Sequence, residues 1–103
     1  MRCMLTVTIP VETGNAAAKD GMLGGTIQSI LEQIKPEAAY FSDRDGRRAA
    51  FLFFDLQDAS QIPSICEPWM QAFNASIEMH PVMIAEDLAK AGSAIERAVK
   101  EFG

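Results

Sequence analysis

A chain of 103 residues suits one domain with a modest core, and its 49% hydrophobic and 22% charged residues are typical of a globular protein, not a disordered one. The net charge of −5 disfavours nucleic acids and anionic membranes, which attract basic proteins. The basic residues cluster only in "RDGRR" (44–48), where an aspartate dilutes them. We expect a single domain over residues 1–103 with neither of these partners.

The first ten residues alternate in polarity. One face is apolar throughout: Met1, Cys3, Leu5, Val7 and Ile9. This period of two predicts a strand, which Pro10 ends. A signal peptide would have a longer apolar run, and no stretch reaches the roughly 20 residues of a membrane span. We therefore interpret the segment as a first strand.

The two cysteines favour a reducing compartment. Cys3 and Cys66 lie among apolar neighbours, without a CxxC pair or the spacing of a zinc site. Two buried free thiols are favoured over a disulfide. We expect a cytoplasmic protein with no metal and no cofactor.

A helix is predicted after the first strand. Asn15 is a candidate N-cap, and apolar residues recur at helical spacing up to Pro36: Leu23, Ile27, Ile30, Leu31 and Ile34. Each glycine in "GMLGGT" (21–26) costs about 1 kcal/mol in a helix interior, so we expect a broken first half and a regular helix over 25–35. The motif lacks the lysine of a phosphate-binding P-loop, so close packing or a kink is favoured.

Two strands, at 37–42 and 47–56, surround the turn sequence "SDRDGR". Its Asp45-Gly46 pair is a strong hairpin signal. In the second strand Phe51 and Phe53 point one way. The remaining large side chains point the other way: Leu52, Phe54 and Leu56.

A second helix is predicted after Asp58 or Ser60, either of which could cap it. Its apolar stripe comprises Ile62, Ile65, Cys66, Trp69, Met70 and Phe73. Pro68 removes an internal hydrogen bond, so we expect a kink or two helical pieces near Glu67. Asn74 is expected to form the C-terminal turn.

The last third of the chain contains one more strand and one more helix. Residues 75–84 alternate again, and Pro81 argues for an edge position. Residues 86–102 form an amphipathic helix whose apolar stripe is Leu88, Ala91, Ile95, Val99 and Phe102.

The element order predicts an α+β fold, a ferredoxin-like βαββαβ four-stranded antiparallel sheet with an extra C-terminal helix. Both crossover helices then cover one sheet face, yet the strand at 47–56 is apolar on both faces. A second copy packed sheet to sheet about a two-fold axis would cover the other face and is the favoured interpretation. The alternative is that the C-terminal helix folds over the open face of its own chain.

The stretch "KPEAAYFSDRDGRRAAFLFFDLQDASQIPSICEPW", with "PVMIAEDLAKA" after it, resembles a group of small uncharacterised bacterial proteins in the dimeric α+β barrel superfamily. This superfamily includes muconolactone isomerases and antibiotic-biosynthesis-type monooxygenases. The resemblance covers nearly the whole chain in element order. It implies a homodimer, a dimeric α/β barrel, with a small cavity in each subunit.

His80 is the candidate catalytic residue, because it is the only histidine and alternation places it on the same strand face as Glu78. A histidine beside a carboxylate can act as a general acid or base near neutral pH. A partly solvated strand histidine bonded to a neighbour is the competing interpretation, and it is favoured because no nucleophile lies at a recognisable spacing.

Four further residues are candidates for substrate binding: Tyr40, Arg48, Phe53 and Trp69. Tyr40 and Arg48 could hold an anionic or enolic oxygen, although Arg48 could equally solubilise the hairpin. Trp69 could wall an aromatic ligand or fill the core. Some monooxygenases of the superfamily use asparagine, tryptophan and arginine, the types of Asn74, Trp69 and Arg48, but no motif aligns them.

Two functions fit these residues. The first is a small homodimer that binds a compact apolar or aromatic metabolite in a pocket against the sheet, with monooxygenase- or isomerase-like turnover as an option. That pocket would be lined by Tyr40, Phe53, Trp69 and His80. The second is a non-catalytic module of the same fold that binds a ligand or a protein.

Overall fold

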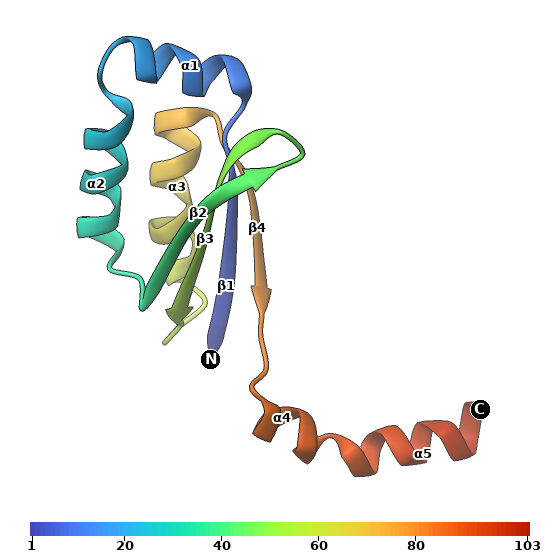
Figure 1. Ribbon diagram of the computed structural model, residues 1–103. Coiled ribbons are helices and arrows are strands. Elements are labelled where there is room, and N and C mark those ends of the chain that lie inside the picture. The colour runs from blue at the N-terminus through green and yellow to red at the C-terminus, as the bar shows by residue number, and fades with distance from the viewer.

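The computed structural model describes residues 1–103 (Figure 1). Its elements, in chain order, are β1 (Arg2–Thr8), α1 (Val11–Lys19), α2 (Leu23–Ile34), β2 (Ala38–Arg44), β3 (Arg47–Asp55), α3 (Gln61–Phe73), β4 (Ser76–Pro81), α4 (Ala85–Lys90) and α5 (Gly92–Phe102). The predicted order of strands and crossovers is confirmed, with α1 and α2 together forming the first crossover.

The four strands form one sheet in the order β2-β3-β1-β4, and all neighbours are antiparallel. This is the ferredoxin-like fold that the element order predicts. Helices α1, α2 and α3 lie on one side of the sheet (Figure 1). We call the opposite side the open face. Strand β4 is an edge strand, as Pro81 predicts, because an edge strand needs no backbone donor on its outer side.

The core lies between the sheet and these helices. Leu5 of β1 stands opposite Leu52 of β3 and Met79 of β4, so all three side chains share the helix-covered face. Leu5 and Leu52 are wholly buried, as are Trp69 and Phe73 of α3, whose rings lie 6.4 Å apart. The alternation predicted for the first and third strands is confirmed.

The first crossover differs in detail from the prediction. Helix α1 begins directly after Pro10, which suits a helix start because proline has no N–H to satisfy there. Asn15 therefore lies inside α1 and does not cap it. The predicted break is present at Gly21, whose φ of +69° is available to glycine without strain, and α2 follows it.

The hairpin turn is confirmed at Asp45-Gly46. These residues have φ values of +51° and +77°, the left-handed pair that a two-residue hairpin turn requires. Asn74 is also confirmed as the turn residue after α3, with a φ of +52° and its N–H donating to the carbonyl of Met70.

Helix α3 continues through Pro68, so the prediction of two helical pieces is wrong. Its first turn is organised by Asp58 and Gln61: the Asp58 carboxylate accepts from the backbone N–H of Ser60, and Gln61 Oε1 accepts from the N–H groups of Gln57 and Asp58. Both cysteines are free and buried, as predicted, and burial raises the pKa of the Cys66 thiol.

The C-terminal segment forms two helices, α4 and α5, so the prediction of one helix over 86–102 is wrong; we call the two helices together the arm. The arm projects away from the side of the sheet that carries α1–α3 (Figure 1). The alternative in which it covers the open face of its own chain is therefore wrong for this structure. No helix is both long enough and apolar enough to cross a bilayer.

The core predicts a clear contrast between two substitutions. Leu52→Ala should destabilise the protein by about 2–5 kcal/mol, because it removes buried methyl groups and leaves a cavity under α3. Met22→Ala, at an exposed position between α1 and α2, should stay within about 0.5 kcal/mol. Urea unfolding at equilibrium measures both, and equal effects would contradict this description of the core.

Candidate functional site

The sheet separates the residues that the sequence proposed for catalysis and substrate binding. Tyr40, Phe53 and His80 belong to the open face, since Tyr40 stands opposite Phe51, and Met4 stands between Phe53 and His80. Trp69 lies on α3, across the sheet. Arg48 is opposite Asp43, on the helix-covered side of the hairpin. A single pocket that holds all of these residues is therefore not present.

The open face carries an aromatic pair. The rings of Tyr40 and Phe53 meet edge to face with their centroids 6.4 Å apart, and Tyr40 is 63% exposed. Phe51 and Met4 beside them are half-buried. This apolar surface is what the pattern of β3 predicts for the open face, and nothing in the chain covers it fully.

A polar contact crosses the open face above these rings. Arg44, at the hairpin end of β2, places Nη1 at 2.9 Å from Oε1 of Glu78 on β4, the opposite edge strand. The hairpin curls toward β4 accordingly (Figure 1), and Thr6, which lies between the two on β1, is only 3% exposed. Arg44 chiefly, with help from His80, lowers the pKa of the Glu78 carboxyl.

His80 is the weakest part of the proposed catalytic chemistry. Its Nε2 lies 3.5 Å from Oε2 of Glu78, at the limit of a hydrogen bond, and its side chain is exposed. It lines neither of the two cavities of the molecule. A pair of this kind can exchange a proton with solvent, but water surrounds it where a catalytic base needs an enclosed substrate.

Arg48 and Trp69 share a cavity on the other side of the sheet. This cavity, which we call the Trp69 groove, has a volume of about 270 Å³. Six of its eight lining residues are hydrophobic; the full set is Ile9, Ile27, Phe41, Ser42, Arg48, Ala49, Ala50 and Trp69. It lies where the hairpin, the end of β1, α2 and α3 meet.

The indole of Trp69 carries an unusual feature. Its Nε1 is buried and has no hydrogen-bond partner, and it is the only buried side-chain polar atom in this condition. An unsatisfied buried donor is uncommon in folded proteins and costs about 1–3 kcal/mol relative to a satisfied one. Trp69, which lines the groove, therefore has a buried donor without an acceptor.

The first helix holds Arg48 at the groove. Arg48 Nη1 donates to Oδ1 of Asn15 over 3.1 Å, so Asn15 positions the guanidinium instead of capping α1. A Cβ added at Gly14 would lie 2.6 Å from the same Nη1 atom. Gly14 thus leaves the space that the Arg48 side chain occupies.

Phe41, which lines the groove, and Asn15, which accepts a hydrogen bond from Arg48 there, were not proposed as site residues from the sequence. Phe41 alternates with Tyr40 along β2, which places the two rings on opposite faces of the sheet. That alternation could have identified Phe41. Asn15 gave no comparable signal, because its partner is distant in the sequence.

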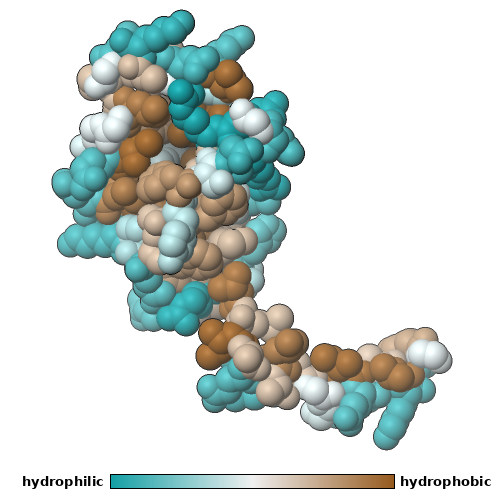
Figure 2. Space-filling model, viewed as in Figure 1, coloured by the Kyte–Doolittle hydropathy of each residue, from teal (hydrophilic) through white to brown (hydrophobic).

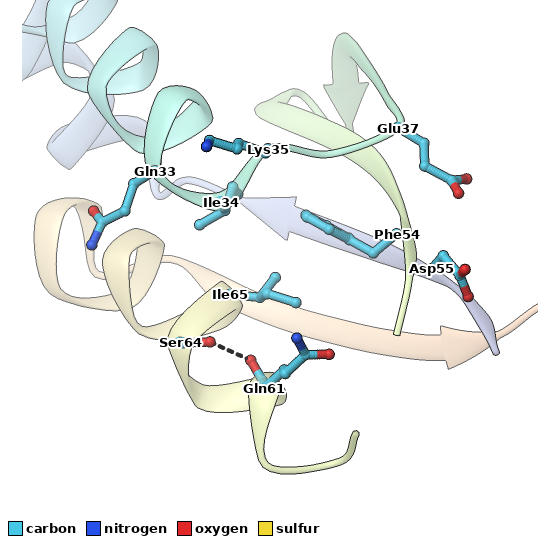
Figure 3. A pocket seen from close by; sticks show the side chains of 9 residues that line it. All are labelled: Gln33, Ile34, Lys35, Glu37, Phe54, Asp55, Gln61, Ser64 and Ile65. Atoms are coloured by element: carbon cyan, nitrogen blue, oxygen red, sulfur yellow. Dashed lines mark hydrogen bonds between the residues drawn. The ribbon is translucent and has the colours of Figure 1, made fainter. Parts of the chain in front are cut away.

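A second hollow, of about 590 Å³, lies at the other end of α2 and α3 (Figure 3). Only three of its nine lining residues are hydrophobic: Ile34, Phe54 and Ile65. Figure 3 shows the polar side chains of Gln33 and Glu37 at its margins. This wide, polar hollow contains no unsatisfied buried donor, so it is the weaker candidate site.

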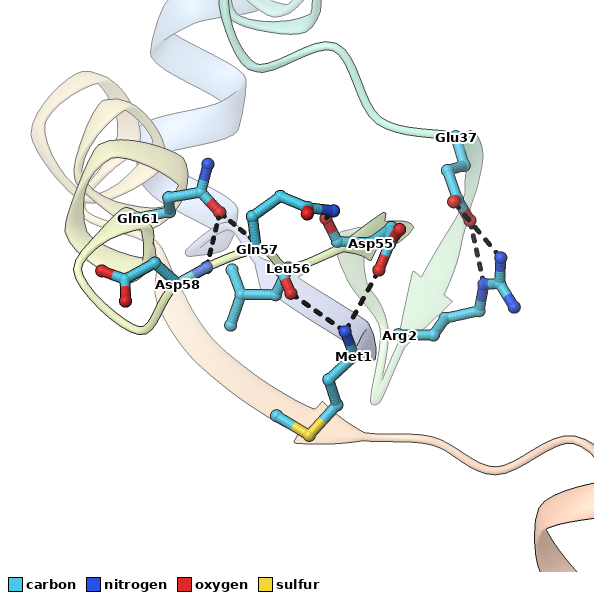
Figure 4. Close-up of polar contacts among 8 residues, drawn as sticks. All are labelled: Met1, Arg2, Glu37, Asp55, Leu56, Gln57, Asp58 and Gln61. Atoms are coloured by element: carbon cyan, nitrogen blue, oxygen red, sulfur yellow. Dashed lines mark hydrogen bonds and ion pairs between the residues drawn. The ribbon is translucent and has the colours of Figure 1, made fainter.

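Ion pairs fix the chain near this hollow (Figure 4). The Met1 ammonium group donates to Asp55 and to the carbonyl of Leu56, and it lowers the pKa of the Asp55 carboxyl. Arg2 Nε lies 2.9 Å from Oε2 of Glu37. These exposed contacts join the start of β1 to the end of β3 and to the residue before β2, and they show no catalytic arrangement.

No protein-family model matches the chain, and no curated protein matches its sequence. A formyltetrahydrofolate deformylase from Burkholderia mallei is similar in structure, with a TM-score of 0.45 and 17% sequence identity. The match covers 79% of this chain and 28% of that one, so this chain spans less than a third of the enzyme's length. A likeness at this level says nothing about activity.

The polar contact at Glu78 predicts a pH effect. Because its pKa is lowered in the folded state, the contact stabilises the fold above the pKa of a free glutamate, and this contribution is lost as the pH falls through the folded value. Arg44→Gln should raise the pKa of Glu78, whereas Arg47→Gln should leave it unchanged. Carboxyl NMR titration measures both, and an unchanged pKa in Arg44→Gln would contradict the contact.

Proposed function

We propose that the protein binds a compact apolar or aromatic small molecule with a hydrogen-bond-accepting group, in the Trp69 groove. The observation that carries this proposal is a mainly apolar cavity lined by Trp69, whose buried Nε1 donor has no partner in the chain. A ligand oxygen placed against the indole would satisfy the donor, and the rest of the ligand would replace water along the groove.

The dimensions of the groove favour a small ligand. Binding cavities for drug-sized molecules begin at about 300 Å³, and a buried apolar cavity of about 150 Å³ accepts benzene. The 270 Å³ of the groove therefore suits one ring or a short branched chain with a polar substituent. Phe41 is half exposed at the groove and offers a ring face to such a ligand.

The free donors of Arg48 favour a ligand with an acidic substituent. A guanidinium has five N–H donors, and the one side-chain hydrogen bond of Arg48 goes to Asn15. The remaining donors suit a carboxylate or an enolate, which arginine can hold in bidentate fashion. A compact aromatic or aliphatic carboxylate combines the apolar body, the acceptor for Trp69 and the charge for Arg48.

Binding without turnover is the better-supported form of this function. His80, the candidate acid or base, lies on the open face, across the sheet from the groove. Monooxygenase- or isomerase-like turnover at His80 would need a second copy to enclose that face. In the alternative function, a protein-binding module, the open face would be the surface that binds the partner.

Ligand binding can be read directly from Trp69, the only tryptophan in the chain. Benzoate, phenylacetate and hexanoate should change its fluorescence on titration, and calorimetry should give matching affinities. Arg48→Gln should weaken benzoate binding by about 10- to 100-fold, the usual range for losing a hydrogen bond to a charged group.

Two controls make this test specific. Arg47→Gln removes the same charge from the adjacent residue, which points to the other face of the hairpin, and should leave binding unchanged. Benzamide, the neutral analogue of benzoate, should be insensitive to Arg48→Gln. If none of the three acids binds at millimolar concentration, the groove is not a site for such ligands.

We also propose that a second copy covers the open face, sheet to sheet, as in the superfamily that the sequence resembles. The aromatic pair on this face and the neighbouring Phe51 and Met4 form an apolar surface without a partner in the chain. Surfaces of this kind mark protein interfaces more often than free surface on monomers. An isologous pair would bury the same patch on both copies.

The two rings of β2 provide a matched test of this dimer. Tyr40→Lys places a charge on the open face and should weaken dimerisation by about 100-fold, as expected for the centre of an interface. Phe41→Lys places it on the helix-covered side and should spare the dimer while reducing ligand binding. Analytical ultracentrifugation measures the dimer, and a monomeric wild type at micromolar concentration would contradict the proposal.

A further inference from the structure

The arm carries a row of exposed apolar side chains along its length. Ile95, Val99 and Phe102 lie at helical spacing on one face of α5, and Leu88 is an exposed apolar residue of α4. Ile95 is 53% exposed and Phe102 85% exposed. Figure 2 shows the hydrophobic atoms of α5 gathered along one side of the helix and the hydrophilic atoms along the other.

No hydrogen bond or ion pair joins the arm to the rest of the chain. Its hydrogen bonds and ion pairs stay within residues 84–103, including the contact of Asp87 with the N–H of Ile84 and that of Lys90 with Glu86. The last backbone contact to the sheet is the N–H of Val82, which donates to the carbonyl of Arg2. The apolar row of the arm is therefore a face without a partner in its own chain.

The overall dimensions show how much surface is involved. The chain exposes 6935 Å², whereas a compact monomer of 11.2 kDa exposes about 5,700 Å². Its radius of gyration is 17.3 Å, against about 13 Å for a compact chain of this length. The excess surface, about 1,200 Å², is larger than the roughly 800 Å² that each partner gives to a stable interface of standard size.

We infer that the arm of each copy packs against the body, residues 1–81, of a second copy of this chain. This inference rests on the sheet-to-sheet dimer proposed above and adds the arm to its interface. The arm projects away from α1–α3, on the side where the open face leaves room for a second copy (Figure 1). One two-fold arrangement then covers both unpartnered apolar surfaces, the arm and the open face, in both copies.

A different partner for the arm would leave the open face bare. The aromatic rings of Tyr40 and Phe53 would remain in water, and a third molecule would be needed to cover them. Exchange of arms between two copies needs no further component. It also explains why the connection from Pro81 to Ala85 directs the arm outward and does not fold it back.

Charged substitutions on the arm test this inference in the full-length protein. The double variant Ile95→Glu/Val99→Glu should weaken the dimer by about 100-fold, measured by analytical ultracentrifugation. Ser93→Glu, which introduces a glutamate on the opposite side of α5, should leave the dimer unchanged. Circular dichroism checks that the helices persist in every variant.

Crosslinking locates the arm independently of stability. Benzoylphenylalanine in place of Val99, in a mixture of ¹⁵N-labelled and unlabelled chains, should crosslink to residues 1–81 of the other chain. Crosslinks confined to residues 85–102 of the other chain would overturn the inference, since the arms would then pair with each other.

The two proposals fail in different ways. A wild type and a double variant with the same dimerisation constant would overturn arm exchange and leave the sheet-to-sheet dimer in place. A wild type that is monomeric at micromolar concentration would overturn both.

Discussion

The constraint on which this structure depends is the apolar character of β3 on both faces. Leu52 and Phe54 face the helices, while Phe51 and Phe53 face the other way. Three helices from two crossovers can cover only one side of a four-stranded sheet, because right-handed connections place them together. The covered side holds the core, and the open face keeps an aromatic surface. The sheet-to-sheet dimer that we propose would cover this surface.

The sheet also divides the chemistry of the protein. Alternation along β2 and β3 sends neighbouring residues to opposite faces, so that Tyr40 and Phe41 never share a surface. His80 on β4 and Trp69 on α3 also lie on opposite sides of the sheet. The helix-covered side has the Trp69 groove, a buried unpaired indole donor and a guanidinium, whereas the open face has a histidine and no cavity. The proposed binding site and the candidate catalytic residue therefore lie on opposite sides of the sheet.

The strands and turns could be predicted because their signals are local. A period of two identifies β1 and β3, and Asp45-Gly46 and Asn74 mark backbone conformations that few residues adopt easily. The missed features depend on distant partners. Asparagine is a common helix-capping residue, but the amide oxygen of Asn15 accepts a hydrogen bond from Arg48, which lies far along the chain. Pro68 indicates a break by its chemistry, yet a buried apolar stripe keeps α3 continuous.

The hairpin contributes aromatic side chains both to the proposed ligand site and to the proposed interface. β2 contributes Phe41 to the Trp69 groove and Tyr40 to the open face, and Arg44 ties the hairpin end to Glu78. A ligand that orders Phe41 therefore acts on the strand that a second copy would contact. If binding and assembly influence each other, the coupling free energy has to be carried by this hairpin, since no other element reaches both surfaces with exposed aromatic side chains.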